Sequence, residues 1–413
     1  MSAPSSTSSA AGSWNPASPR RRVERALLEG LQRILARSRV RLVLWDGTVL
    51  AGSGGTSATV VVHDLRTLLG ILWDPELHFG DAFSDGRLQV EGDLLSFLES
   101  SFGTWRDAPL DALGRAARYV GRRFGDRIAS RRDVHHHYDL GNDFYRLWLD
   151  EGMVYTCAYF RSPGDSLEDA QVAKMDHVCR KLRLRPGETV IEAGCGWGAL
   201  ALHMARHYGV RVRAFNISRE QIRHARERAY AEGLQGRVEF VDADFRSIQG
   251  TADAFVSVGM LEHVGLANYR ALGDVIDRCL HPQHGRGLLH FIGRNRMRPL
   301  SAWIRRRVFP GAYPPTLAQV AERVLEPRDL SILDVENLRV HYAATLAHWR
   351  RRFDSAASRV AAMFDERFVR TWRLYLAGSE AAFSTGYLQL FQVTFGRSRD
   401  NGAPWTRAEL YEP

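Results

Sequence analysis

The strongest chemical signal in the chain is a glycine-rich turn at residues 190–198, which read VIEAGCGWG. An apolar run leads into the turn, and a helical run, ALALHMARHYG, follows it directly. Glycines let a ligand approach the backbone closely, and the start of the following helix offers free N–H groups. The spacing is shorter than that of a dinucleotide fingerprint, and no lysine follows the glycines, which excludes a P-loop. The turn predicts a small-molecule site at the end of a strand.

The acid and glycines of this turn, E-x-G-x-G-x-G, resemble the first motif of Rossmann-like S-adenosylmethionine methyltransferases. In such enzymes the second strand usually ends on an acid that binds the ribose, but RVRAFNIS carries none. Ser218 and Gln221 match a helix-capping box, in which Ser218 caps the helix and Gln221 reaches back. After the third strand, Asp244 would reach the adenine edge and Phe245 could stack on the ring.

The elements around these motifs alternate between β-rich and helical runs from about Val134 onward. This order predicts a parallel, doubly wound α/β sheet. A helical stretch at about 297–380 interrupts the alternation, and the final run TGYLQLFQVTFGR could close the sheet. The sequence therefore predicts a disordered tail, a small α+β domain, a basic helical linker and a catalytic domain, at residues 1–22, 23–110, 111–133 and 134–413.

The expected N-terminal domain begins with an amphipathic helix, RVERALLEGLQRILARS, from Val23. Two or three short strands follow, broken at Asp46-Gly47 and at glycine-rich turns. Residues 65–72 and 94–102 read as helices around a polar, turn-rich middle, HFGDAFSDGRLQVEGD. No cluster of catalytic residues is visible in this domain.

Composition limits the class of protein and its partners. The chain has 413 residues, 45% of them hydrophobic, and a net charge of +9. These values exclude a disordered, collagenous or coiled-coil protein and favour an anionic partner. No run approaches the roughly 18 apolar residues of a membrane span, and the start lacks the order of a secretory signal. With four widely spaced cysteines, we expect the reducing cytoplasm.

Several further segments narrow the family. They are HYDLGNDFY at 137–145, YTCAYF at 155–160, GMLEHVG at 259–265, LHFIG at 289–293, VFPG at 308–311 and ENLRVHY at 336–342. Together they resemble the cyclopropane-fatty-acyl-phospholipid synthases, the family that includes the mycolic acid cyclopropane synthases. The resemblance runs from about residue 22 to the C-terminus and includes HFGDAFSDGRLQVEGDL in the phospholipid-handling N-terminal domain.

The resemblance implies a Rossmann-like class I methyltransferase with helical, lipid-covering insertions. Such an enzyme transfers a methylene unit from S-adenosylmethionine to a cis double bond in a phospholipid acyl chain. A bound bicarbonate ion then serves as the base that closes the ring. Its cage maps onto Cys157, Glu262, His290, the backbone of Ile292, and Tyr342. Taken singly, these side chains are equally consistent with core packing.

The resemblance also assigns the cofactor site. Its residues are Tyr155, Thr156, Gly194, Gly196, Ile217, Gln221 and Phe245 or its neighbour Arg246, and Asp244 joins them from its place after the third strand. The rings of Tyr138, Tyr155 and Tyr159 could shield the sulfonium by cation–π contact, with ordinary packing as the alternative for Tyr159. The triple histidine at 135–137 has no partners at ligand spacing, so we expect no metal.

Substrate and partners follow from the same resemblance. Phe291 departs from the smaller polar residue common in relatives and could reshape the acyl tunnel. We expect transient docking on the anionic inner membrane face through the first helix, the basic linker or the segment WIRRRVF at 303–309, and a homodimer is implied by the family. Methylene- or methyl-branched products, amine methylation and a non-catalytic lipid-binding role remain open alternatives. A nucleic acid is not expected, because the chain has no N-P-P-[YF] motif.

Overall fold

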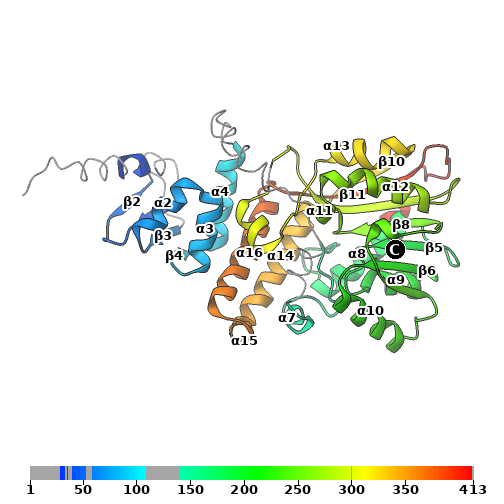
Figure 1. The fold of residues 1–413 in the computed structure, drawn as a ribbon, viewed down its shortest axis with the longest axis horizontal. Helices are drawn as coiled ribbons and strands as arrows, with labels where there is room; N and C mark the ends of the chain where they lie inside the picture. The colour runs from blue at the N-terminus through cyan, green and yellow to red at the C-terminus, as the bar shows by residue number, and fades with distance from the viewer. Residues whose placement is uncertain are drawn as a thin grey trace, which may run out of the picture.

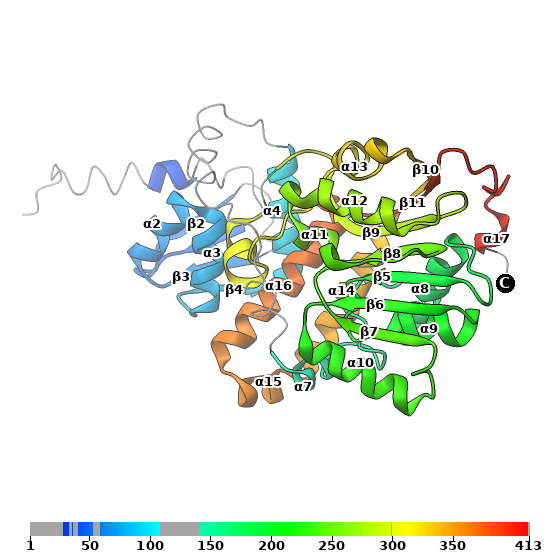
Figure 2. The ribbon, with the colours of Figure 1, turned by 45° about the vertical axis from the view of Figure 1, so that its right-hand side comes forward.

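A seven-stranded sheet dominates the larger part of the protein (Figure 1), in the strand order β10-β11-β9-β8-β5-β6-β7, which can be followed in Figure 2. The computed structural model describes residues 28–32, 35, 40–52, 58–107, 140–298 and 300–411. Strands β7, β6, β5, β8 and β9 are parallel, whereas β11 is antiparallel to both of its neighbours. The strands are β5 Thr189–Ala193, β6 Arg211–Asn216, β7 Val238–Asp242, β8 Ala254–Val258, β9 Arg286–Gly293, β10 Leu330–Asn337 and β11 Gln389–Arg397.

Helices cover both faces of this sheet, which confirms the predicted doubly wound core (Figure 2). Val190 and Val256 pack with α8, α9 and α10, while Ile191 and Phe255 face the opposite cluster with α12. Because both faces are buried, every residue of the central strand β8 is buried, and four of its five residues, AFVSV, are apolar. The helices of this domain are α7 Asn142–Arg146, α8 Leu167–Lys181, α9 Ala199–Tyr208, α10 Arg219–Ala231, α11 Leu261–Val264, α12 Tyr269–Cys279, α13 Leu317–Val320, α14 Arg339–Ser355, α15 Ala357–Met363, α16 Glu366–Ser384 and α17 Ala408–Tyr411.

Strand β11 confirms the prediction that the run TGYLQLFQVTFGR closes the sheet. The prediction that residues 297–380 are helical throughout is wrong, because β10 lies within them. This strand pairs with β11 alone and is partly exposed along its length, so its sequence, LSILDVEN, lacks a clear apolar alternation. Because an edge strand is partly exposed, its sequence does not show the apolar run by which the buried strands of this sheet were predicted.

The N-terminal domain is a four-stranded sheet, β2-β1-β3-β4, with helices packed against it. Its elements are β1 Val40–Val43, β2 Val49–Ala51, β3 Ala58–Val62, α2 Leu65–Trp73, α3 Pro75–Ser84, β4 Leu88–Gly92 and α4 Leu94–Asp107. The expected early strands and flanking helices are confirmed, and residues 28–32 are helical. The predicted tail at 1–22, the linker at 111–133 and the histidines at 135–137 lie outside the described residues.

The predicted turn-rich middle of this domain is wrong, because it contains α3 and β4. Asp74 caps α3 by accepting a hydrogen bond from the Leu77 N–H at 3.2 Å, and Pro75 occupies the first helical position. Both are standard signals for a helix start. The turn between the two elements is short and includes Gly86, whose φ is +73°.

The N-terminal domain packs on α16 and on residues 300–309 of the catalytic domain. Asp81 accepts hydrogen bonds from Arg307 at 2.8 and 2.9 Å, and Asp85 accepts one from Arg367 at 2.7 Å. Trp303 is only 4% exposed and lies against Gly80. The suggestion that Trp303 docks on a membrane is therefore wrong, because its ring joins the two domains. Every helix in the described ranges is too short or too polar to cross a bilayer.

We expect Gly80→Ala to weaken the contact between the two domains. A Cβ at this position would lie 2.6 Å from Cδ2 of the buried Trp303 ring, so the ring or α3 must shift. Such overpacking costs about 1–3 kcal/mol. Thermal unfolding followed by circular dichroism should show a lower melting temperature.

The matched control is Gly378→Ala in α16, where a Cβ meets no atom within 4 Å. A helical glycine with open space around it should gain up to about 1 kcal/mol on replacement by alanine. Equal melting temperatures for the two variants would contradict the importance of the Trp303 contact.

Candidate functional site

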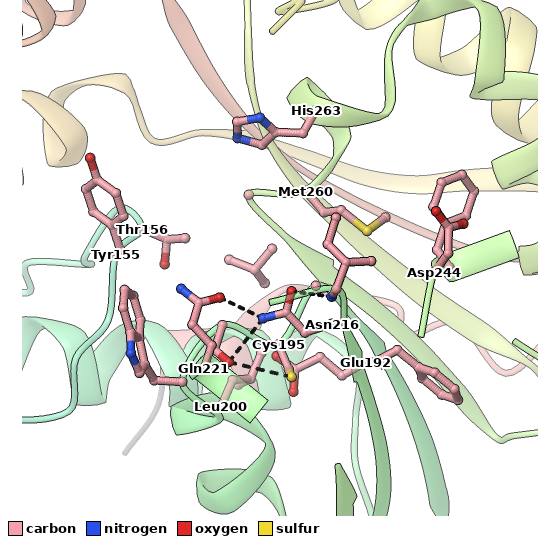
Figure 3. Close-up of a pocket in the computed structure, with 18 of the residues that line it drawn as sticks. Tyr155, Thr156, Glu192, Cys195, Leu200, Asn216, Gln221, Asp244, Met260 and His263 are labelled. Atoms are coloured by element: carbon pink, nitrogen blue, oxygen red, sulfur yellow. Dashed lines mark hydrogen bonds between the residues drawn. The ribbon is translucent and has the colours of Figure 1, made fainter. Parts of the chain in front are cut away.

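A cavity of about 700 Å³ lies at the carboxyl ends of β5, β6, β7 and β8 (Figure 3). Strands β6 and β7 lie on one side of β5, and β8 lies on the other. This reversal of strand order is where open α/β sheets bind their ligands. All nine residues predicted for the cofactor line the cavity: Tyr155, Thr156, Gly194, Gly196, Ile217, Gln221, Asp244, Phe245 and Arg246.

The glycine turn presents bare backbone to this cavity. Gly194 and Gly196 have φ values of +85° and +53°, which favour glycine. The N–H groups of Gly194 and Cys195 donate to the Phe215 carbonyl at 2.8 and 3.1 Å, so the turn is fixed against β6. A Cβ on Gly196 would meet no protein atom within 4 Å. The turn thus leaves room for a ligand to approach its main chain.

Asn216 occupies the position where an acid was expected, and it organises the neighbouring polar groups (Figure 3). Its Oδ1 accepts from the Ile217 N–H at 2.8 Å, and its Nδ2 donates to Gln221 Oε1 at 2.7 Å. Ser218 caps α10 as predicted, because its Oγ accepts a hydrogen bond from the main-chain N–H of Gln221 at 3.4 Å. The expectation that the Gln221 side chain reaches back to complete the capping box is wrong, because it bonds to Asn216 and lines the cavity.

Asp244, Phe245 and Arg246 form the wall at the end of β7. Arg246 donates two hydrogen bonds to the Asp244 carboxylate, each 2.8 Å long, and its guanidinium lies 5.7 Å from the centre of the Phe245 ring. The aromatic ring and the carboxylate are thereby held in one arrangement beside the cavity. The assignment of Asp244 to the adenine edge remains a prediction.

Two of the three tyrosines expected to shield a cation can be compared with the structure. Tyr155 lines the cavity, and its hydroxyl lies 2.8 Å from that of Tyr375. Tyr159 instead stacks between His177 and His341, at centroid distances of 4.3 and 4.8 Å. A shielding role for Tyr159 is therefore wrong, since both faces of its ring are already packed. Tyr138 lies outside the described residues.

Two buried charged residues in the cavity wall were not predicted as site residues. Burial raises the pKa of Glu192 to about 8 and lowers that of Lys174 to about 8, although the charges of Asp150 and Glu192 favour the lysine cation. Lys174 donates to Thr156 Oγ1 at 3.1 Å, while Glu192 Oε2 has no hydrogen-bond partner within the described part of the chain. For Glu192 the sequence did offer a signal, because this residue is the acid that precedes the glycines of the turn. Lys174 is one of only two lysines in the sequence.

The five predicted cage residues come from β9 and from segments that contact it or its neighbour β11. The Ile292 N–H donates to Glu262 Oε1, which ties α11 to β9. Leu390 pairs with Ile292, and its carbonyl accepts from Leu338 N at 2.8 Å. The Sγ of Cys157 lies 3.9 Å from the Leu338 carbonyl, and the main-chain N–H of Tyr342 donates to the same carbonyl at 3.1 Å. His290 lies on the same face of β9 as Ile292, two residues earlier in the strand.

The polar atoms of this cluster are buried and incompletely paired. Glu262 and His290 are 4% and 2% exposed, and neither Glu262 Oε2 nor His290 Nε2 has a hydrogen-bond partner among the described residues. Burial raises the pKa of Glu262 to about 7, against the effect of the Ile292 N–H. Burial also lowers the pKa of His290 well below its usual value. A buried imidazole and a buried carboxyl group near β9 thus each keep one atom without a hydrogen-bond partner among the described residues.

Two further features of this region bear on its chemistry. Burial raises the pKa of the Cys157 thiol, so it remains protonated and is not a thiolate nucleophile. Phe291 faces the other side of β9 and packs on Phe391 at 5.8 Å. The expectation that Phe291 reshapes the tunnel beside His290 is therefore wrong, because successive strand residues point to opposite faces. Among the residues described, no cluster of three or more His, Cys, Asp or Glu side chains could hold a metal ion.

Comparison with known proteins identifies related sequences. A sequence model of the mycolic acid cyclopropane synthetase family matches residues 126–393. The chain is 37% identical over 390 residues to a "Probable fatty acid methyltransferase" of Pseudomonas putida, covering 90% of this chain and 96% of the relative. It is 42% identical over 267 residues to the cyclopropane-fatty-acyl-phospholipid synthase of Escherichia coli (strain K12), covering 64% of this chain and 68% of the relative.

Solved structures of the same type also match. The mycolic acid cyclopropane synthase CmaA1, complexed with SAH and CTAB, is 30% identical and superposes with a TM-score of 0.61. The alignment covers 65% of this chain and 98% of the other. The cyclopropane synthase MmaA2 from Mycobacterium tuberculosis gives the same TM-score at 31% identity, over 65% of this chain and 98% of the other.

The buried Glu262 carboxyl predicts a pH-dependent change in stability. Its pKa rises on folding from the usual 4.5 to about 7. At about 1.4 kcal/mol per pH unit this corresponds to roughly 3 kcal/mol. This contribution to the free energy of unfolding is fully present below the unfolded pKa of 4.5, where the carboxyl group is protonated in both states. It is lost as the pH rises through 7, because the folded protein then holds an unfavourable buried charge. Glu262→Gln should therefore raise the melting temperature far more at pH 8 than at pH 5.

The control for this measurement is Glu91→Gln, which changes an exposed carboxylate on β4. It should shift the melting temperature little at either pH. A Glu262→Gln shift of the same size at both pH values would contradict the buried-charge explanation.

Proposed function

Because the chain belongs to the mycolic acid cyclopropane synthetase family, we propose that it cyclopropanates membrane phospholipids. As a member of that family, it is an S-adenosylmethionine-dependent methyltransferase with a class I fold. The proposed reaction adds a methylene unit to the cis double bond of an unsaturated acyl chain. The main support is that two buried atoms, Glu262 Oε2 on α11 and His290 Nε2 on β9, have no hydrogen-bond partner among the described residues. Simple methylation of an amine would need no such pair.

The residues of the cavity fit S-adenosylmethionine. The open space beside Gly196 accommodates a ligand on the main chain, and Gln221 lies beside it with its amide nitrogen directed away from Asn216 (Figure 3). The carboxyl group of Glu192 could bind the ammonium group of S-adenosylmethionine, and the ring of Phe245 could stack on its adenine. When bound, S-adenosylmethionine supplies the methyl group as part of a sulfonium.

The residues of the cage fit bicarbonate. His290 Nε2 would donate to the ion, Glu262 Oε2 would accept from its hydroxyl, and the Tyr342 hydroxyl would supply a further donor. Ile292 contributes indirectly, because its N–H is already donated to Glu262. When bound, bicarbonate supplies the base that takes the proton lost on ring closure.

An alkene is a weak nucleophile, so the site must exclude water and hold the reacting atoms in line. Tyr155 links the cavity to a large aromatic cluster, with ring contacts to Trp148 and Trp349 at 5.2 and 5.3 Å. Phe309 packs against Tyr375 at 5.5 Å in the same region. These rings give an apolar surrounding suited to an acyl chain, where a lone charged base would be costly.

A second product is favoured by one comparison. The relative that aligns over 90% of this chain is named a probable fatty acid methyltransferase. On the same fold, a hydride shift within the carbocation followed by loss of a proton from the new methyl group would give a methylene branch. Loss of a proton from the acyl chain itself would give a methyl branch beside a double bond. Product structure therefore decides between the two outcomes.

The reaction is tested with purified protein, S-adenosylmethionine and vesicles of cis-monounsaturated phospholipid, with the products examined by proton NMR. We expect upfield cyclopropane ring protons. Glu262→Gln should reduce ring formation by about 100-fold or more, since removing a positioned acid–base group has effects of this size. Mass alone is insufficient, because a ring and a methylene branch each add one CH2.

The exposed Glu91→Gln variant is the control and should keep wild-type turnover. Vinylidene protons would move the function to acyl branching. Absence of any lipid product from protein that still binds S-adenosylhomocysteine would overturn the proposal.

The substrate implies an anionic phospholipid surface as a partner, and α2 offers a suitable face. Leu65, Leu69, Leu72 and Trp73 are all exposed, Trp73 by 88%. Their spacing places them along one side of the helix. Arg66 is exposed beside them and would face anionic headgroups. We therefore assign the docking surface to α2 in place of Trp303.

We expect Trp73→Ser to weaken binding to anionic vesicles about 30-fold in a co-sedimentation assay, because a large apolar side chain is worth about 2 kcal/mol when buried. Binding should also weaken as salt is raised. The matched control is Trp405→Ser, since Trp405 is also fully exposed but lies near the C-terminus. Equal effects of the two changes, or binding indifferent to salt and lipid charge, would contradict this assignment.

A further inference from the structure

A buried chain of hydrogen bonds reaches His290 at Nδ1, on the opposite side of the ring from Nε2. Gln392 lies on β11 directly opposite His290 on β9, and its Nε2 is 3.0 Å from His290 Nδ1. The Gln392 Oε1 accepts from Lys181 Nζ at 2.8 Å. Gln392 and His290 are 0% and 2% exposed, so water does not compete for these contacts.

Lys181 determines which way the Gln392 amide faces. An ammonium group has only donors, so the atom that meets it must be the amide oxygen. The amide nitrogen is then left to face His290, and an amide nitrogen only donates. His290 Nδ1 must therefore accept, which requires that it carry no proton. In the neutral ring the proton resides on Nε2, the atom with no partner among the described residues.

Lys181 is itself held in place. Its Nζ donates to Glu336 Oε2 at 2.6 Å, and His177 Nε2 lies 2.7 Å from the same oxygen. Burial alone would raise the pKa of Glu336, but the His177 hydrogen bond and the Lys181 charge lower it to about 2. Tyr159 stacks on His177 and completes the support. The ionised Glu336 thus keeps the ammonium next to Gln392.

We propose that Gln392, oriented by Lys181, is a positioning residue that holds His290 as a neutral ring with its proton on Nε2, directed at the bound anion. This inference rests on the proposed function, because it deepens the role of His290 in the cage. The opposite tautomer would place two N–H groups face to face and leave a lone pair toward an anion. An imidazolium would make the same clash with the Gln392 amide.

The tautomer is tested directly by ¹⁵N NMR of histidine-labelled protein without substrate, with His290 assigned by its loss in His290→Gln. We expect the Nδ1 resonance at the downfield position of an unprotonated nitrogen and a proton attached to Nε2. Gln392→Met should abolish this fixed state and give a mixture of tautomers. A proton on Nδ1 in the wild-type protein would overturn the proposal, whatever the variants do.

Kinetics provide a second test. Gln392→Met should reduce kcat about 10- to 100-fold, the usual effect of removing the group that orients a functional histidine, while the Kd for S-adenosylhomocysteine stays unchanged. In a His290→Gln background the same change should cost nothing further, because Gln392 acts through His290. An additive loss in the double variant would overturn the positioning role.

Gln389→Met is the matched control. Gln389 is a buried glutamine on the same strand, but it bonds to Asn337 and to the Gly386 carbonyl. It should leave the His290 spectrum and kcat at wild-type values, and a change equal to that of Gln392→Met would count against the proposal. If the wild-type enzyme makes no cyclopropane, the proposed function fails, but the tautomer measurement still decides this inference.

Discussion

The site depends on one constraint, the burial of the Glu262 carboxyl with a single hydrogen bond from the main chain of β9. The Ile292 N–H holds Oε1, while Oε2 has no partner within the described residues. A charge in such a position is costly, so the pKa rises to about 7. The neighbouring strands make the arrangement possible. Val258 on β8 lies in register with His290 on β9, so α11, which follows β8, delivers Glu262 beside β9.

The same sheet therefore carries two neighbouring sites with different chemical character. The cavity at the ends of β5 to β8 is lined by main chain, amides and charged groups that fit a large polar cofactor. The cage residues around β9 instead place a few buried polar atoms within an apolar core. Strand β11, which is antiparallel to both of its neighbours, brings Gln392 to the same place, and α14 begins just after the edge strand β10 ends. Thus the non-parallel extension of the sheet is what completes the second site.

The sequence predicted the features that depend on local chemistry or on both faces of a strand being covered. The glycine turn and the parallel core are confirmed, and the nine residues expected to hold the cofactor line one cavity, while the roles of the cage residues remain a prediction. It failed where tertiary contacts decide the outcome. Trp303 and Tyr159 looked available but are packed, and Phe291 faces away from its neighbour His290. Gln392 could not be found, because its partner Lys181 lies 211 residues away in the chain and glutamine in a strand carries no motif.

The central claim is that Glu262 and His290 hold a carbonate-type anion inside the protein. The most direct measurement loads the protein with ¹³C-bicarbonate, removes free ion in CO2-free buffer, acidifies the sample and determines the released ¹³CO2 by mass spectrometry. The account predicts about one equivalent per chain in the wild-type protein and in Glu192→Gln, whose carboxyl lies in the neighbouring cavity, and a loss in Glu262→Gln. No bound carbonate in the wild-type protein, or equal amounts in both variants, would contradict it.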